Sequence, residues 1–148
     1  MAKNRIVNTK FWDDSYIIDL DPIEKLLFLY LLTNPLTNIA GIYEVQNRRI
    51  AFDTGIDKEM VEKILGRFER DGKIVRKGDW LFIKNFIKNQ SLNPSVLSGI
   101  RKELSNLPID FLEQLGDSLS QTPLSNLIKS NLTESNLKAK IGVWKKSS

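Results

Sequence analysis

The 148 residues include no cysteine and no histidine. The absence of cysteine excludes disulfide frameworks, thiol nucleophiles and zinc sites of the Cys/His type. The absence of histidine removes the side chain that most readily moves protons near neutral pH. The sequence also has no glycine-rich phosphate loop of the G-x-x-x-x-G-K-S/T type. We therefore expect a protein that is not an enzyme and that holds no cofactor.

A metal site is not expected either. The densest acidic group lies between Asp13 and Asp21. Asp21 is suited to cap a helix, and Asp13 and Asp14 would diverge around one, so these carboxylates do not gather around a single cation.

Long apolar runs are also absent. The longest extends from Leu26 to Leu32, far short of the about 20 residues that a membrane-spanning helix needs. Residues 1–6 lack the apolar core of an export signal. The hydrophobic fraction of 41% is sufficient for one core, so we expect a globular chain with no membrane partner and a cytoplasmic location.

Positive charge is unevenly distributed along the chain. The formal net charge is +4, from 22 basic and 18 acidic residues. Residues 46–102 hold thirteen basic and seven acidic side chains, which is an excess of +6, whereas residues 1–45 hold four and six and residues 103–148 hold five of each. A phosphate-binding surface needs such a cationic block, although lysines spread for solubility give a similar count.

Helical patterns dominate the first part of the chain. Asp21-Pro22 is typical of a helix start, and Asn34-Pro35 of its end. An apolar stripe over Phe11–Leu20 predicts a short packing helix before it, with Trp12 in the core or an interface. Residues 47–52 predict a brief helix closed by a glycine turn. The next helix is capped by Asp57, and its inward stripe is Met60, Val61, Ile64, Leu65 and Phe68.

Short β-rich runs lie between and after these helices. Ile42–Val45 alternates and predicts a strand. Lys73–Arg76 and Trp80–Phe86 are separated by Lys77-Gly78-Asp79, which predicts a tight hairpin. Helix, strand, helix, turn, helix, hairpin is the element order of a winged helix-turn-helix domain. The predicted fold class is therefore mainly α with a small β-hairpin, and the domain covers residues 1–90.

The remainder of the chain differs in composition. Residues 91–116 predict a helical extension with Val96, Leu97, Ile100 and Leu104 on one side. Residues 117–148 are rich in serine, asparagine and leucine and repeat the tripeptide Ser-Asn-Leu. Polar spacers dilute these leucines below what a core requires, so we expect a flexible tail.

Several short motifs carry a family resemblance. They are Asn8–Asp13, the helix start at Asp21-Pro22, Ala40–Tyr43 and the stretch Phe86–Pro94 after the hairpin. Together they resemble the N-terminal part of phage and prophage replication-initiation proteins, or replisome organisers, which are related to DnaD-like primosome proteins. The resemblance covers about residues 5–115. It implies a winged-helix module that binds origin DNA or self-associates inside a bacterial host, with a region that contacts the host helicase or its loader.

The helix over residues 57–70 is the first candidate DNA contact. In a helix-turn-helix the corresponding helix lies in the major groove. Its outward face is expected to carry Lys63 and Arg70, with Lys58 and Arg67 nearer the flanks. Acidic residues share this face, so a solvated surface with internal ion pairs is the alternative.

The hairpin is the second candidate. Lys73, Arg76 and Lys77 approach its tip, and Lys84 follows on the return. Cations on a wing can bind phosphates or enter the minor groove. The alternative is an edge hairpin that uses lysine to prevent aggregation.

The short helix with Arg48 and Arg49 is the third candidate. In a docked module it would cross the DNA backbone. The alternative is that one arginine pairs with Glu44 or Asp53.

We expect a non-catalytic DNA-binding module of a phage replication-initiation protein, whose wing and recognition helix contact duplex DNA. The alternatives are a winged-helix module for oligomerisation or protein interaction in a primosome-type assembly, and a winged-helix transcriptional regulator. The candidate DNA-binding residues are Arg48, Arg49, Lys58, Lys63, Arg67, Arg70, Lys73, Arg76, Lys77 and Lys84.

Overall fold

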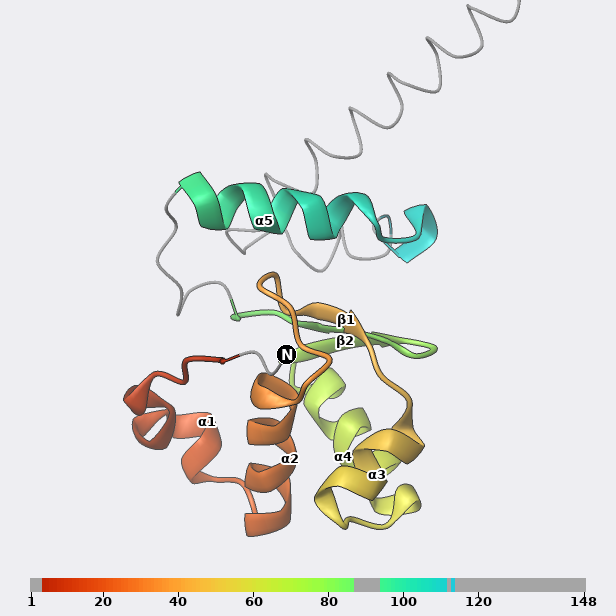
Figure 1. Cartoon of the computed structure of the whole chain (residues 1–148). Helices are drawn as coiled ribbons and strands as arrows, with labels where there is room; N and C mark the ends of the chain where they lie inside the picture. The colour runs from red at the N-terminus through yellow and green to blue at the C-terminus, as the bar shows by residue number, and fades with distance from the viewer. Residues whose placement is uncertain (1–3, 87–93, 112, 114–148) are drawn as a thin grey trace, which may run out of the picture. The chain divides into compact units, whose positions relative to one another are not determined.

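The computed structural model describes residues 4–86, 94–111 and 113. The chain divides into two units, Met1–Gln90 and Ser91–Ser148, which are described separately. The described part is mostly helical and contains a small antiparallel sheet of three strands (Figure 1). The coarse prediction of an α-rich fold with a β-hairpin is therefore confirmed.

The first unit begins with two short helical segments followed by a longer helix. They are the 3-10 helix η1 (Thr9–Asp13), α1 (Ser15–Ile18) and α2 (Pro22–Thr33). The single short helix predicted over residues 11–20 is thus divided, because the Asp14 side chain accepts the Tyr16 and Ile17 N–H groups and starts a new helix. Trp12 is 59% exposed, so of its two expected places the core is excluded and an interface stays a prediction.

Two further helices follow β1. They are α3 (Asn47–Thr54) and α4 (Lys58–Arg70), both close to their predicted bounds. Gly55 ends α3 with a positive φ of 76°, and the Asp57 side chain accepts the Glu59 N–H group at the start of α4. Most of the predicted stripe of α4 is buried. Met60 is the exception, because it is 40% exposed.

The sheet consists of β1 (Ile42–Glu44), β2 (Ile74–Lys77) and β3 (Trp80–Ile83). The strand order is β1-β3-β2, and all neighbours are antiparallel. Lys77 pairs with Trp80, so the turn between β2 and β3 contains only Gly78 and Asp79. Gly78 has a φ of 58°, which suits the first position of a two-residue hairpin turn. The hairpin is therefore one residue tighter than predicted.

The core lies between the helices and one face of the sheet. It contains Leu27 and Leu31 of α2, Ile64 and Phe68 of α4, and Leu81 of β3, all nearly inaccessible to solvent. Helices that hide only one stripe need such a partner surface, and burial of these side chains is the main stabilising contribution. The packing fixes α3 and α4 beside the hairpin.

One glycine is required by close packing. Gly41 has a φ of 73°, and a Cβ added there would lie 2.6 Å from the Cβ of Phe86. Any larger residue at position 41 would have to displace Phe86, which follows β3. This close approach holds the chain after the hairpin against the start of β1.

The second unit contains α5 (Pro94–Ser105). Ile100 and Leu104 are buried, as expected from their shared helical face. The predicted extension over residues 91–116 is described only in part, and the predicted tail over residues 117–148 lies outside the described residues. Within the described ranges, no helix combines the length and apolarity needed to cross a bilayer.

Candidate nucleic-acid interface

Arg76 links the end of the hairpin to the start of α3. Strand alternation places it on the same side of β2 as the buried Ile74, so its guanidinium turns toward the body of the domain. It donates to the backbone oxygens of Val45 and Asp79 at 2.6 and 3.0 Å, and to Asn47 Oδ1 at 2.7 Å. Burial lowers the pKa of Arg76 below its ordinary value. The group predicted as a phosphate contact is therefore occupied within the chain.

Arg67 is also tied internally. Its guanidinium donates to the buried carboxylate of Glu24 on α2, and its Nε lies 3.5 Å from Asp71 Oδ2. Burial by itself would raise the pKa of Glu24, but the hydrogen bonds from the Asp21 N–H and from Arg67 outweigh it and hold that pKa below its ordinary value. Arg67 thus neutralises a carboxylate between α2 and α4.

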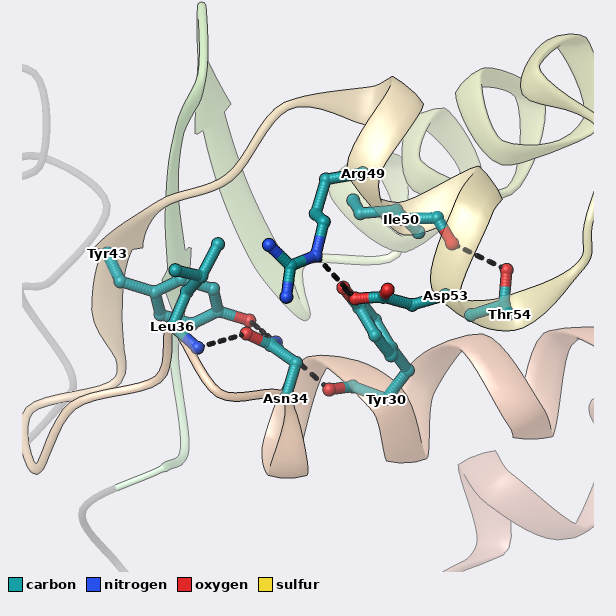
Figure 2. Close-up of polar contacts among 8 residues, drawn as sticks. All are labelled: Tyr30, Asn34, Leu36, Tyr43, Arg49, Ile50, Asp53 and Thr54. Carbon is teal, nitrogen blue, oxygen red and sulfur yellow. Dashed lines mark hydrogen bonds and ion pairs between the residues drawn. The ribbon is translucent and has the colours of Figure 1, made fainter. Parts of the chain in front are cut away.

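Arg49 forms a third internal contact, with Asp53 one turn later on α3. Its Nε lies 2.7 Å from Asp53 Oδ2, and the Tyr30 hydroxyl of α2 donates to the same oxygen at 2.7 Å. Figure 2 shows these three side chains converging between α2 and α3. The hydrogen bonds from Tyr30 and Arg49 lower the pKa of Asp53. For Arg48 and Arg49, the sequence left open that one of them pairs with Glu44 or Asp53. The ion pair between Arg49 and Asp53 agrees with that alternative.

We call Arg49, Arg67 and Arg76 the clamp arginines. Each uses part of its charge or its donors on groups of its own domain. Arg67 and Arg76 join elements that are distant in the sequence, whereas Arg49 pairs within α3 with Asp53, which in turn accepts the Tyr30 hydroxyl of α2. The Arg49 and Arg67 side chains stay 45% and 39% exposed, but carboxylates of the same domain compensate their charge. Three of the ten candidate DNA-binding residues therefore have polar partners within the first unit.

Five other candidates stay exposed, and we call them the exposed cations. None of them forms an ion pair with another residue of the described ranges; the Arg48 side chain does donate to Gln46 Oε1 at 3.1 Å. They lie at the start of α3, along α4 and at the end of the hairpin. They are Arg48, Lys58, Lys63, Arg70 and Lys77.

The outward face of α4 has no excess of positive charge. Three exposed cations lie on this helix, and three exposed carboxylates, Glu59, Glu62 and Glu69, accompany them. Glu59 and Lys63 are four residues apart, a spacing at which opposite charges attract. This face matches the alternative of a solvated, internally compensated surface more closely than a strongly cationic recognition helix.

Lys73 and Lys84 lie at the base of the hairpin, away from Lys77. The Lys73 ammonium lies 4.6 Å from the centroid of the Tyr16 ring. A Cβ on Gly72 would be 3.9 Å from Lys84 Nζ, which places that ammonium beside the end of α4, where a helix dipole favours positive charge. At about 3.3 Å per residue, Lys73 is roughly 13 Å from Lys77 along the strand. The predicted hairpin cations therefore form two separate groups.

The end of the hairpin and the start of α3 form one corner of the domain. The corner is defined by Arg48, Arg76, Lys77, Glu44 and Asp79, so three cations accompany two carboxylates. No side chain caps the first backbone N–H groups of α3. Free N–H groups and the positive end of the helix dipole attract anions such as phosphate. This corner, with two exposed cations at its edges, is the candidate nucleic-acid interface.

The partners of Arg67 and Arg76 were not identified from the sequence. Glu24 lies 43 residues from Arg67, and no local pattern connects them. The inward direction of Arg76 had no decisive signal either, because Ile74 and Val75 are both buried and strand alternation pairs Arg76 with the first and Lys77 with the second.

In the part of the chain that the structure describes, no group of three or more acidic residues is arranged to hold a metal ion.

Comparison with protein-family models, with curated proteins and with solved structures finds no match to this chain.

Proposed function

We propose that the first unit is a winged helix-turn-helix that binds duplex DNA and does not catalyse a reaction. The order α2, β1, α3, α4, β2, β3 and the strand order β1-β3-β2 support this fold, since the hairpin is then the wing and α3 and α4 form the helix-turn-helix. The proposed contact is to the DNA backbone.

The contact between Arg76 and the start of α3 carries the proposal. It holds the hairpin end beside uncapped backbone N–H groups, and the residues next to the two partners in the sequence, Lys77 and Arg48, stay exposed. Backbone binding needs this combination of cations and N–H donors, and it requires no base readout. Because exposed cations and carboxylates balance on α4, we do not propose that this helix discriminates strongly between DNA sequences.

The biological setting is proposed from the resemblance alone. Motifs within residues 5–115 resemble replication-initiation proteins of phages and prophages, and this supports a role in origin binding. The same resemblance makes the host helicase or its loader a candidate partner.

A titration of duplex and single-stranded DNA by fluorescence anisotropy at two salt concentrations tests the function. We expect duplex binding that weakens steeply with salt. The double variant Arg48→Ala/Lys77→Ala should bind about tenfold more weakly and show a salt slope smaller by about two, one for each lost phosphate contact.

The matched control removes two cations outside the corner, in Lys10→Ala/Lys25→Ala. It should keep the salt slope within about half a unit of the original chain. Equal loss in both double variants would show that only net charge matters. Absence of binding to either form of DNA at low salt would overturn the proposal.

Self-association is a second candidate function, favoured by one group of exposed apolar side chains. Ile18 at the end of α1 and Ile23 and Leu26 on α2 are 56%, 49% and 47% exposed. Neighbouring exposed apolar side chains are typical of interaction surfaces. Light scattering at several concentrations tests this: Ile23→Asp should lower the mean mass if the surface assembles copies, and a mass that stays monomeric throughout contradicts it.

A further inference from the structure

A pocket lies where the N-terminal segment meets α2 and the base of the hairpin. Its volume is about 160 Å³, and all of its lining residues belong to the first unit. Aromatic rings form much of the wall, and Phe11 and Tyr16 both contact the ring of Phe28, with centroids 6.2 and 6.3 Å apart. Phe86, held against Gly41, closes another side. The site already proposed for DNA uses none of these residues.

The polar lining of the pocket is positively charged. Lys10 and Lys73 line it, and neither forms an ion pair with a residue in the described ranges. The carboxylate of Asp14 is directed to the N–H groups of Tyr16 and Ile17 as a helix cap. Because this charge is partly satisfied by the backbone, the two ammonium groups are not fully compensated at the pocket.

We propose that this pocket binds a small aromatic carboxylate of about the size of benzoate. An apolar protein cavity of about 150 Å³ accommodates benzene, so a single ring fits a pocket of this volume. Apolar walls with a few placed charges are the usual composition of a small-molecule site. The ring would pack against the phenylalanines, and the carboxylate would lie between the two lysines.

Lys73 is the better positioned of the two cations. Its ammonium is already placed 4.6 Å from the Tyr16 ring centroid, so part of the entropy cost of ordering it is met before the ligand binds. A bound ligand would join residues 6–16, α2 and the hairpin base, and would therefore stabilise the N-terminal segment against unfolding.

The test is a titration of the full chain with benzoate, followed by amide NMR shifts and by thermal unfolding. We expect saturable shifts in residues 11–17 with a dissociation constant on the order of 1 mM, as befits a ligand of so few atoms. At ten times that concentration the midpoint of unfolding should rise by roughly 5 °C. Benzamide, which has the same shape without the charge, should bind at least about fivefold more weakly.

Variants connect the binding to this pocket. Lys73→Met should weaken benzoate about fivefold, whereas Lys63→Met on the exposed face of α4 should leave it unchanged. Val7→Trp should fill the pocket and abolish binding, and Leu32→Phe serves the same purpose if the first variant fails to fold.

Absence of saturable shifts up to about 20 mM benzoate, twenty times the expected dissociation constant, overturns the proposal. If benzamide binds as tightly as benzoate, the proposed role of the carboxylate is wrong. If benzoate binding is unchanged in a folded pocket-filling variant, the ligand does not bind in this pocket.

Discussion

The clamp arginines and the exposed cations come from the same cationic stretch of sequence, yet they do different work. The clamp arginines bind carboxylates or backbone oxygens and join α2, α3, α4 and the hairpin. The exposed cations form no ion pair with described residues and remain available to a partner. A count of cations therefore overestimates a binding surface, because a guanidinium with several donors can instead stabilise the fold.

Arg76→Ala should have the largest effect on this comparison. It removes three hydrogen bonds and leaves the backbone oxygen of Val45 without its charged donor. We expect the free energy of unfolding to fall by about 2–3 kcal/mol, measured by urea denaturation. Lys77→Ala is the matched control on the neighbouring position and should change stability by less than about 0.5 kcal/mol. Equal effects of the two variants would remove the distinction between the two groups.

Glu24→Ala should have the next largest effect. Glu24 accepts both the Asp21 N–H at the start of α2 and the Arg67 guanidinium, and its side chain is buried. Loss of the cap and of a charge-assisted bond should lower the free energy of unfolding by about 1–2 kcal/mol. Glu62→Ala on the exposed face of α4 is the control and should unfold at nearly the original urea concentration. A Glu24 variant as stable as this control would mean that Arg67 is not a structural clamp.

The pH dependence of stability should reveal the same contact. The folded pKa of Glu24 is below its ordinary value of 4.5, so its contribution is present above the unfolded pKa and is lost as pH falls through the folded pKa. We expect stability to decrease as the pH is lowered from about 5 toward 3, and Glu24→Gln to make this decrease shallower. Parallel pH profiles for the two proteins would show that Glu24 does not contribute to it.

The smallest effect is expected for Arg49→Gln/Asp53→Asn. This double variant removes one charge of each sign from an ion pair on the surface of α3, and the net charge is unchanged. Duplex affinity should stay within about twofold and the salt slope should not change, because an exposed, compensated pair contributes little to either property. A loss of affinity as large as that of Arg48→Ala/Lys77→Ala would move Arg49 from the clamp arginines to the DNA-binding group.

The sequence was sufficient for the elements that have local signals. Asp21-Pro22 started α2, Gly55 ended α3 and Asp57 capped α4, and each acts through neighbours within a few residues. The prediction was wrong for Met60, and Trp12 does not lie in the core, because exposure at the edge of an apolar stripe depends on what packs there. A helical period indicates the direction of a stripe and not its width.

The candidate interface was harder to predict, because it depends on contacts between distant residues. Tyr30 meets Asp53 across 23 residues, and Arg67 meets Glu24 across 43. No spacing rule connects such pairs, so the sequence could show how many cations there are but not which of them are compensated. Strand alternation did not identify Arg76 either, because Ile74 and Val75 place an apolar residue on each face of β2.

The two-residue turn at Gly78-Asp79 also limits how far the hairpin can reach. Strands of four residues extend only about 13 Å, and the tip is held to the start of α3 by Arg76. Under the proposed function, the hairpin of one copy would thus reach only a few base pairs along a duplex. Hairpin contacts along a longer DNA site would then require several copies side by side, with the spacing between them set by the helical repeat of the DNA.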